Sequence, residues 1–359
     1  MCKLYFYDMD IENETFWIPE YETGIIFEGN IKTGHTKIIS RDMYKTFKNK
    51  CFFRGIYNCG DKLLLANQGE QNAIIYNRFD NQFYKTQIRN LPSKSVWDFQ
   101  HDSIIETEKN YYIILVYGEI VKADKELCEF ECIGSIPNDT KESCYKKVVK
   151  KDKCIYVLIK NKIYAFNSET ETYFECNMFE TENNIETMCF DGTFFWISTN
   201  SGEIICSDKK RRLQIEQDKL YLLNESPGVR KFLESYCCND IIWLVPCYVD
   251  RILCFDIKSM SIRPFLLPGE EENSETLNRV RRKNKQKVIA SIRLNEELLV
   301  LSSKTEQLYR VDMVKKRVEI LKCDIDRRTL MSERLKLAEI ITEGTNINIK
   351  DYIEYWRTL

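Results

Sequence analysis

The sequence is poor in the residues that build metal and catalytic sites. Only two histidines occur, His35 and His101, and they lie far apart in the chain. The 15 cysteines include no Cys-x-x-Cys pair, although a structural zinc site needs four converging ligands that usually come as such closely spaced pairs. The phosphate-binding P-loop and Gly-x-Gly-x-x-Gly motifs are also absent. We therefore expect no metal site and no cofactor.

Long apolar runs and an excess of one charge are missing too. No stretch approaches 18 apolar residues, and Met1–Asp10 lacks the apolar core of a secretory leader. The formal net charge is only −2, so no overall field attracts the chain to nucleic acid or to an anionic membrane. Most cysteines lie inside apolar segments, which indicates reduced thiols that pack as small apolar side chains. We expect a cytoplasmic protein that binds neither nucleic acid nor a membrane.

Short apolar segments separated by polar turns make up most of the chain. Ile, Val, Tyr, Phe and Thr dominate these segments, which favours strands. Asn239–Leu267 shows the pattern, with the apolar runs IIWLVP, RILCFDI and IRPFLL. The polar turn before the strongest strand recurs at Asn13, Gly60, Lys109, Asp152, Asp191, Asn239 and Asn295. From Asn13 to Asn295 these six steps average 47 residues, a period that indicates a repeat protein.

Each repeat contains four apolar segments. In the sixth they are KFLESYC, IIWLVP, RILCFDI and IRPFLL, and in the fifth we expect the last strand within Gln214–Leu223. Seven repeats of four strands predict antiparallel sheets that bury their two apolar faces by stacking on one another. Trp17, Trp196 and Trp243 are interpreted as packing residues between sheets. The count would become six or eight if a weak repeat such as Asp102–Ile133 were miscounted.

With these repeats the chain resembles the broad β-propeller group of kelch-like, WD40-like and NHL-like proteins, over roughly Lys3–Leu321. The kelch double glycine is absent, and the single Trp-Asp pair, Trp97-Asp98, precedes an inner strand and does not end one. The resemblance therefore implies an architecture and no subfamily. It implies an all-β protein, a seven-bladed β-propeller of four-stranded antiparallel blades with a short α-helical C-terminal tail.

The C-terminal tail departs from the strand pattern. We expect Ser332 to cap a helix with Leu335 and Ala338 on one face, and Asn348 to cap a second, shorter helix. The predicted division is a propeller over residues 1–328 and a helical tail over residues 329–359. The basic run Lys146–Lys151 is interpreted as a solvent-exposed loop, in preference to a phosphate-binding patch.

Candidate binding residues follow from the order of strands in a blade. The loop between the second and third strands lies on the same face as the connections between blades, and the resemblance implies that ligands bind there, near the central opening. On this face we expect Tyr21, Gln68, Trp97, Asp98, His101, Tyr117, Lys160, Asn200, Arg230, Tyr248 and Arg251. Their mixture of aromatic, amide and cationic groups suits recognition of a protein surface, a peptide or a glycan, although ordinary exposed loops carry the same mixture.

Two functions from different classes stay open. The first is a non-enzymatic propeller scaffold that binds a partner protein or peptide through this loop face. The second is a propeller enzyme, a hydrolase or lyase, or a carbohydrate-binding protein, acting at the central opening. His101 beside Asp98 and Asp102 is the one constellation that could orient an imidazole with a carboxylate, and a local turn explains the same residues. The missing catalytic motifs favour the first function.

Overall fold

The computed structural model describes most of the chain, in two units. The described residues are 8–21, 23–40, 53–67, 70–137, 145–159, 161–216, 231–247, 251–268, 288–302, 307–321, 328–332 and 335–336. Unit 1 comprises Met1–Ile88, Val96–His101 and Leu321–Leu359, and unit 2 comprises Arg89–Ser95 and Asp102–Ile320.

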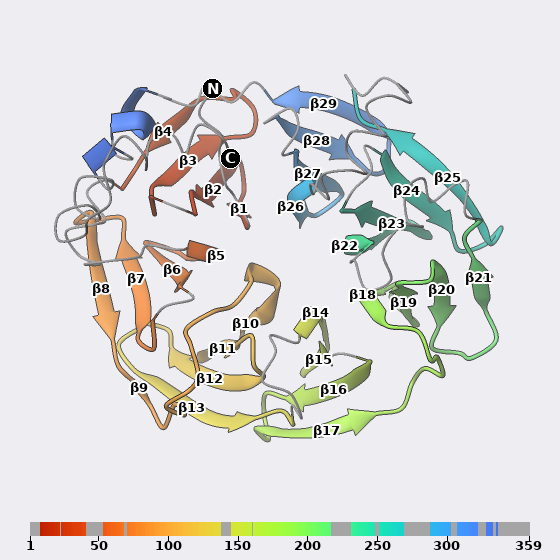
Figure 1. Cartoon of the computed structure of the whole chain (residues 1–359), viewed down its shortest axis with the longest axis horizontal. Helices are drawn as coiled ribbons and strands as arrows, with labels where there is room; N and C mark the ends of the chain where they lie inside the picture. Colours follow the sequence, from red (N-terminus) through yellow and green to blue (C-terminus); the bar gives the residue numbers. More distant parts are fainter. Residues whose placement is uncertain are drawn as a thin grey trace, which may run out of the picture. The chain divides into compact units, whose positions relative to one another are not determined.

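Unit 1 contains two four-stranded antiparallel sheets, coloured red to orange in Figure 1. The first consists of β1 (Asp10–Glu12), β2 (Thr15–Pro19), β3 (Ile26–Asn30) and β4 (Thr36–Ile38). The second consists of β5 (Phe53–Cys59), β6 (Lys62–Asn67), β7 (Ala73–Asn77) and β8 (Gln82–Thr86). Unit 1 also includes helical residues 328–332 and 335–336.

Unit 2 contains five further sheets, coloured yellow to blue (Figure 1). The first is preceded by the 3₁₀ turn η1 (His101–Ser103), and a short extra strand, β9 (Ile88–Arg89), adds to its outer side. The strands of the five sheets are β10 (Ile104–Glu106), β11 (Asn110–Ile114), β12 (Glu119–Asp124) and β13 (Phe130–Ser135); β14 (Tyr145–Lys151), β15 (Cys154–Ile159), β16 (Lys162–Asn167) and β17 (Thr172–Cys176); β18 (Ile185–Phe190), β19 (Phe195–Thr199), β20 (Glu203–Cys206) and β21 (Arg212–Gln214); β22 (Phe232–Cys238), β23 (Ile241–Pro246), β24 (Arg251–Asp256) and β25 (Ser261–Leu266); and β26 (Val288–Leu294), β27 (Glu297–Ser302), β28 (Leu308–Asp312) and β29 (Arg317–Leu321).

The seven sheets confirm the predicted fold class of seven four-stranded antiparallel blades. In each sheet the four main strands lie in sequence order, so every blade takes them from one continuous stretch of chain. The weak repeat Asp102–Ile133 is a complete blade with β9 added at its edge.

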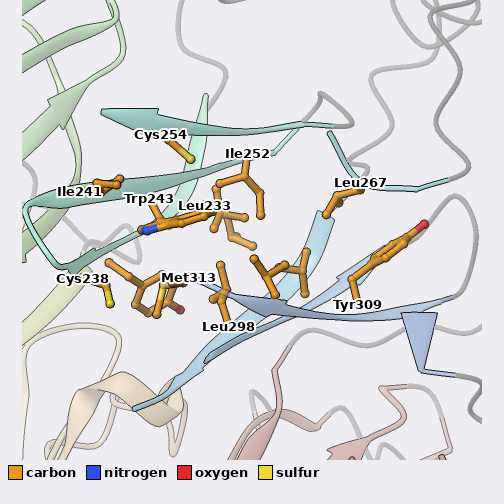
Figure 2. Packing of buried hydrophobic residues seen from close by; sticks show 14 of the residues in the cluster. Leu233, Cys238, Ile241, Trp243, Ile252, Cys254, Leu267, Leu298, Tyr309 and Met313 are labelled. Carbon is orange, nitrogen blue, oxygen red and sulfur yellow. The ribbon is translucent and has the colours of Figure 1, made fainter. Parts of the chain in front are cut away.

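The second strand of a sheet is buried on both faces, because its successive side chains pack alternately on one face and on the other. This explains apolar runs such as IIWLVP. In β23, Trp243 belongs to a buried cluster that includes Leu298 and Tyr309 of the next sheet (Figure 2). Its neighbour Leu244 points the other way and packs with Trp196 of the preceding sheet. Successive side chains of a strand alternate between faces, and a strand buried on both faces therefore reads as one apolar run.

The two ends of each sheet are built differently. At one end, here called the turn end, two to four residues join the first strand to the second and four or five join the third to the fourth. The other end, here called the connection end, carries the loops between second and third strands and the connections between sheets. The connections between sheets run from eight to 21 residues. Side chains fix the turn end, because an Asn or Asp oxygen accepts backbone N–H groups of every turn between third and fourth strands. These residues are Asn30, Asn77, Asp124, Asn167, Asp208, Asp256 and Asp312.

Two boundary predictions were wrong. The last strand of the fifth repeat is Arg212–Gln214, because Asp208 closes a tight turn that brings Arg212 opposite Ile205. The C-terminal helix already includes residues 328–332, so Ser332 does not precede it; the fully buried Leu330 holds the earlier turn in place. The predicted helix after Asn348 lies outside the described residues.

Candidate functional site

A repeated bulge shapes the connection end, where the first strands begin. The pairing of first and second strands shifts by one residue near the start of β5, β14, β18, β22 and β26. A bulge of this kind re-aims the adjacent side chains. The residue after the bulge is Gly55, Lys147, Thr187 and Glu234 in the first four of these strands. Two of these residues, Lys147 and Glu234, place charged side chains at equivalent, buried positions of two blades.

In unit 1 this position is a glycine because a connection passes directly over it. A Cβ on Gly55 would lie 2.0 Å from the carbonyl oxygen of Phe99. The close approach brings the segment Trp97–His101 against the start of β5. Three of the predicted site residues lie on this segment.

His101 is held by an aspartate that precedes β1. Its ring Nδ1 lies 2.8 Å from Oδ1 of Asp8, and its backbone N–H donates to Oδ2 of Asp8 at 2.8 Å. The Ile56 N–H of β5 donates to the same Oδ2 at 3.3 Å. The side chains of His101 and Asp8 are 12% and 7% exposed. Asp8 therefore fixes the orientation of the imidazole and joins the connection to β5. A carboxylate that orients an imidazole is an arrangement found in histidine general bases.

Asp10 forms the second link between β1 and β5. Its carboxylate accepts the N–H groups of Ile11, at 2.7 Å, and of Asn58. Burial raises the pKa of Asp10 from 3.8 to about 6, while the nearby His101 and the two N–H donors act in the opposite direction. Desolvation outweighs these partners.

Trp97 and Asp98 are buried and have partners inside unit 1. The Trp97 indole donates to the Leu65 carbonyl at 2.8 Å. Asp98 pairs with Arg54 at 3.2 Å, and burial raises the pKa of the Asp98 carboxyl although Arg54 opposes the rise.

In unit 2 a buried lysine joins the starts of three sheets. The ammonium of Lys147, in β14, contacts Asp102 of η1 at 2.5 Å and also Glu234 of β22. The Lys147 side chain is 5% exposed, and its nitrogen lies 4.9 Å from the centre of the Tyr236 ring. Burial alone would lower the pKa of Lys147, but Asp102 and Glu234 raise it well above its ordinary value. An ammonium held in this way is no nucleophile, since it keeps its proton.

Neighbouring first strands in unit 2 are linked by two more polar side chains. Glu186 of β18 accepts the backbone N–H groups of Lys231 and Phe232 at 2.9 Å. The Tyr236 hydroxyl donates to the Ser291 carbonyl at 2.9 Å. Polar groups at the starts of these strands therefore bind one another.

The structure gives each member of the constellation proposed around His101 a charged partner from outside it. The imidazole meets Asp8, whereas Asp98 pairs with Arg54 and Asp102 pairs with Lys147. Sequence reasoning missed Asp8, Asp10, Arg54, Lys147 and Glu234, and it wrongly interpreted Lys146–Lys151 as solvent-exposed, because Lys147 is buried in β14. A charged residue near the start of an apolar first strand, as in YKKVVK or KFLESYC, was the available signal.

The other candidate residues are only partly described. Tyr21, Tyr117 and Asn200 lie half-buried in loops between second and third strands, at the connection end. The Asn200 side chain accepts the Asn184 N–H at 3.1 Å, which ties its loop to the connection that precedes β18. Arg251 begins β24, but its side chain is not among those described. Gln68, Lys160, Arg230 and Tyr248 lie outside the described residues.

The described residues contain neither a candidate metal site nor a candidate membrane-spanning helix. No group of three or more His, Cys, Asp or Glu side chains is arranged to hold a metal ion there. No helix in the same part of the chain is long and apolar enough to cross a membrane.

Comparison with known proteins places the chain by its fold. No family model matches the sequence, and no curated protein matches it. Among solved structures, the chain is similar to YCF48 bound to D1 peptide, with a TM-score of 0.57 at 12% identity over 86% of this chain and 92% of that one. The RRP9 WD40 repeats give 0.56 at 9% identity, over 83% and 87%. The computationally designed Ika8 protein gives 0.56 at 9% identity, over 88% and 86%.

Some similar structures are much longer, and this chain covers 39% of the tricorn protease chain, at a TM-score of 0.53 and 9% identity. At identities this low the likeness shows the fold alone. Together with the seven four-stranded sheets, it identifies the chain as a seven-bladed β-propeller that belongs to no assigned subfamily.

Proposed function

We propose that this protein is a non-enzymatic scaffold that binds a partner protein or peptide at the connection end of its blades. The observation that carries the proposal is the pairing of Lys147 with Asp102 and Glu234. In unit 2 these charged side chains lie at the starts of the first strands. They bind one another and are not presented to a small substrate. Recognition is then left to the loops around them, where rigid scaffolds usually present their binding residues.

The difference between the two ends of each sheet supports the same surface. Short, side-chain-tied turns make the turn end uniform from blade to blade, whereas the connection end carries every long segment and the half-buried Tyr21 and Tyr117. Tyrosine is enriched among residues that dominate binding energy. The described cysteines are free thiols, which supports a reducing, cytoplasmic setting for the interaction.

Affinity purification of the full chain from its native cell tests the proposal with matched aromatic variants. We expect the variant Tyr117→Ala, in unit 2, to retain at least about tenfold less partner than the unaltered chain. Phe79→Ala is the control, because Phe79 is 91% exposed in a turn-end loop, and it should retain the partner fully. Unaltered melting temperatures would show that all variants are folded. Recovery of the chain alone, or partner loss only in Phe79→Ala, would refute binding at the connection end.

Catalysis at His101 is the alternative, favoured by one observation, the contact of its ring with Asp8. It predicts hydrolysis of some member of a panel of activated esters and glycosides that disappears in His101→Asn. His35→Asn is the matched control, because His35 is the other histidine of the sequence and is exposed. Activity that survives His101→Asn, or no activity in the unaltered chain, would exclude this site for these reactions.

A further inference from the structure

One blade of unit 2 carries an added fifth strand on its outer side. Strand β9 lies alongside β13 (Figure 1). The Arg89 guanidinium contacts Glu129 at 3.2 Å and Glu131 at 3.7 Å, and the Asn90 amide donates to Glu131 at 3.1 Å. An apolar–basic segment of the chain itself thus closes this sheet edge.

The next blade has the same geometry, and none of the described strands closes it. Strand β17 ends the sheet order β14-β15-β16-β17. Tyr173 pairs with Phe166, the second-last residue of β16, as Phe130 pairs with Ala123, the second-last residue of β12. Phe130 is 1% exposed, whereas Tyr173 is 41% and the following Phe174 54% exposed. Two consecutive aromatic side chains, on opposite faces of β17, are therefore partly exposed. At the equivalent edge of the neighbouring blade, β9 pairs with β13 and Phe130 is buried.

The other outer strands carry residues that discourage strand addition. A free edge pairs readily with another chain, and proteins prevent this with lysine, other charges or proline. Lys37 lies in β4, Lys85 in β8, Arg212 in β21, Pro264 in β25 and Arg317 in β29. Strand β17, Thr-Tyr-Phe-Glu-Cys, contains no lysine, arginine or proline, and its single charged residue is Glu175. It is the outer strand of this fold that is best suited to pairing.

We propose that β17 accepts an extended segment of a partner protein as a fifth strand, and that this segment has an apolar residue next to a basic one, as Ile88-Arg89 has. Main-chain hydrogen bonds would supply affinity, as in other strand additions, and the apolar residue would cover Tyr173 or Phe174. Glu171 and Glu175 flank the edge with side chains 36% and 38% exposed. They hold Lys122 and Lys162 in surface pairs, which cost little to exchange, so an incoming arginine can bind them as Arg89 binds Glu129 and Glu131. This surface is distinct from the connection end.

A peptide copied from the chain tests the proposal without knowledge of the partner. The probe is the fluorescently labelled segment Lys85–Leu91, KTQIRNL, titrated with the full chain and followed by anisotropy. We expect saturable binding that Phe174→Lys weakens at least about tenfold, since it places a lysine on the edge. Phe79→Lys is the matched control and should bind as the unaltered chain does. A probe with Arg89→Glu should also bind at least about tenfold more weakly.

Three outcomes would overturn the proposal. They are the absence of saturable binding, equal binding by Phe174→Lys, and a dimer in light scattering that Phe174→Lys dissociates, which would assign the edge to a second copy of the chain. Phe174 is half exposed, so its replacement should leave the melting temperature unchanged; Phe174→Ser provides a second, uncharged test. The connection-end variant Tyr117→Ala should bind the probe normally, so failure of one surface is distinguishable from failure of the other.

Discussion

Replacing Lys147 by methionine should lower the free energy of unfolding by about 3–5 kcal/mol, because it leaves two carboxylates near one another without their cation. Glu234 is 9% exposed and Asp102 25% exposed, so water can compensate only in part. Equilibrium denaturation in urea at neutral pH measures the change. The exposed lysine Lys153, which pairs with Glu169, is the matched control, and Lys153→Met should leave the stability almost unchanged.

Removing the whole charge cluster should restore much of this loss. In the triple variant Lys147→Met/Asp102→Asn/Glu234→Gln no buried charge lacks a partner, and about half or more of the stability should return. A loss below about 1 kcal/mol in Lys147→Met would contradict the burial of this cluster. Loss without any recovery in the triple variant would mean that Lys147 acts through its packing instead of its charge.

Asp10 should make the protein less stable as the pH rises from about 4 to above 6. Its folded-state pKa, about 6, lies above its ordinary value of 3.8, so the folded state binds the proton more tightly than the unfolded state does. The stabilisation is complete below pH 3.8 and is lost as the pH rises through about 6. The total loss is about 3 kcal/mol, at about 1.4 kcal/mol per pKa unit.

Urea titrations of the unaltered chain and of Asp10→Asn, at several pH values, check this dependence. The stability difference between the two proteins should shift by about 3 kcal/mol in favour of the variant across this range. The pH dependence is the readout, because asparagine offers one acceptor oxygen where Asp10 uses two. Asp256→Asn is a useful contrast, since turn N–H groups lower the pKa of Asp256 and its pH effect has the opposite sign. Parallel curves for the unaltered chain and Asp10→Asn would show that Asp10 ionises normally.

The fold could be predicted because packing leaves a periodic trace in the sequence. Each second strand buries both faces, so apolar runs such as KLLLAN and IIWLVP recur with polar turns between them. The strand boundary near Gln214 was misplaced because a side-chain hydrogen bond from Asp208 sets the turn length, and periodicity does not detect such bonds.

The charged clusters could not be predicted for a different reason. Asp8 and Lys147 look like ordinary surface charges, because their burial depends on partners 93 residues and 87 residues away, His101 and Glu234. His101 was identified as a candidate, but its carboxylate partner was sought among its neighbours in sequence. The partner instead comes from another blade, where only the fold brings it near.

The continuity of each blade has a consequence for how this chain can be divided. Because the four main strands of every described sheet come from one stretch of sequence, a break in a connection, for instance between β21 and β22, cuts no strand pair within a blade. The two fragments would keep their ladders intact and would find each other through contacts between blades, such as Glu186 with the Phe232 N–H and Trp196 with Phe255. In engineering terms, the chain is a natural candidate for a split protein whose halves report on reassembly by packing.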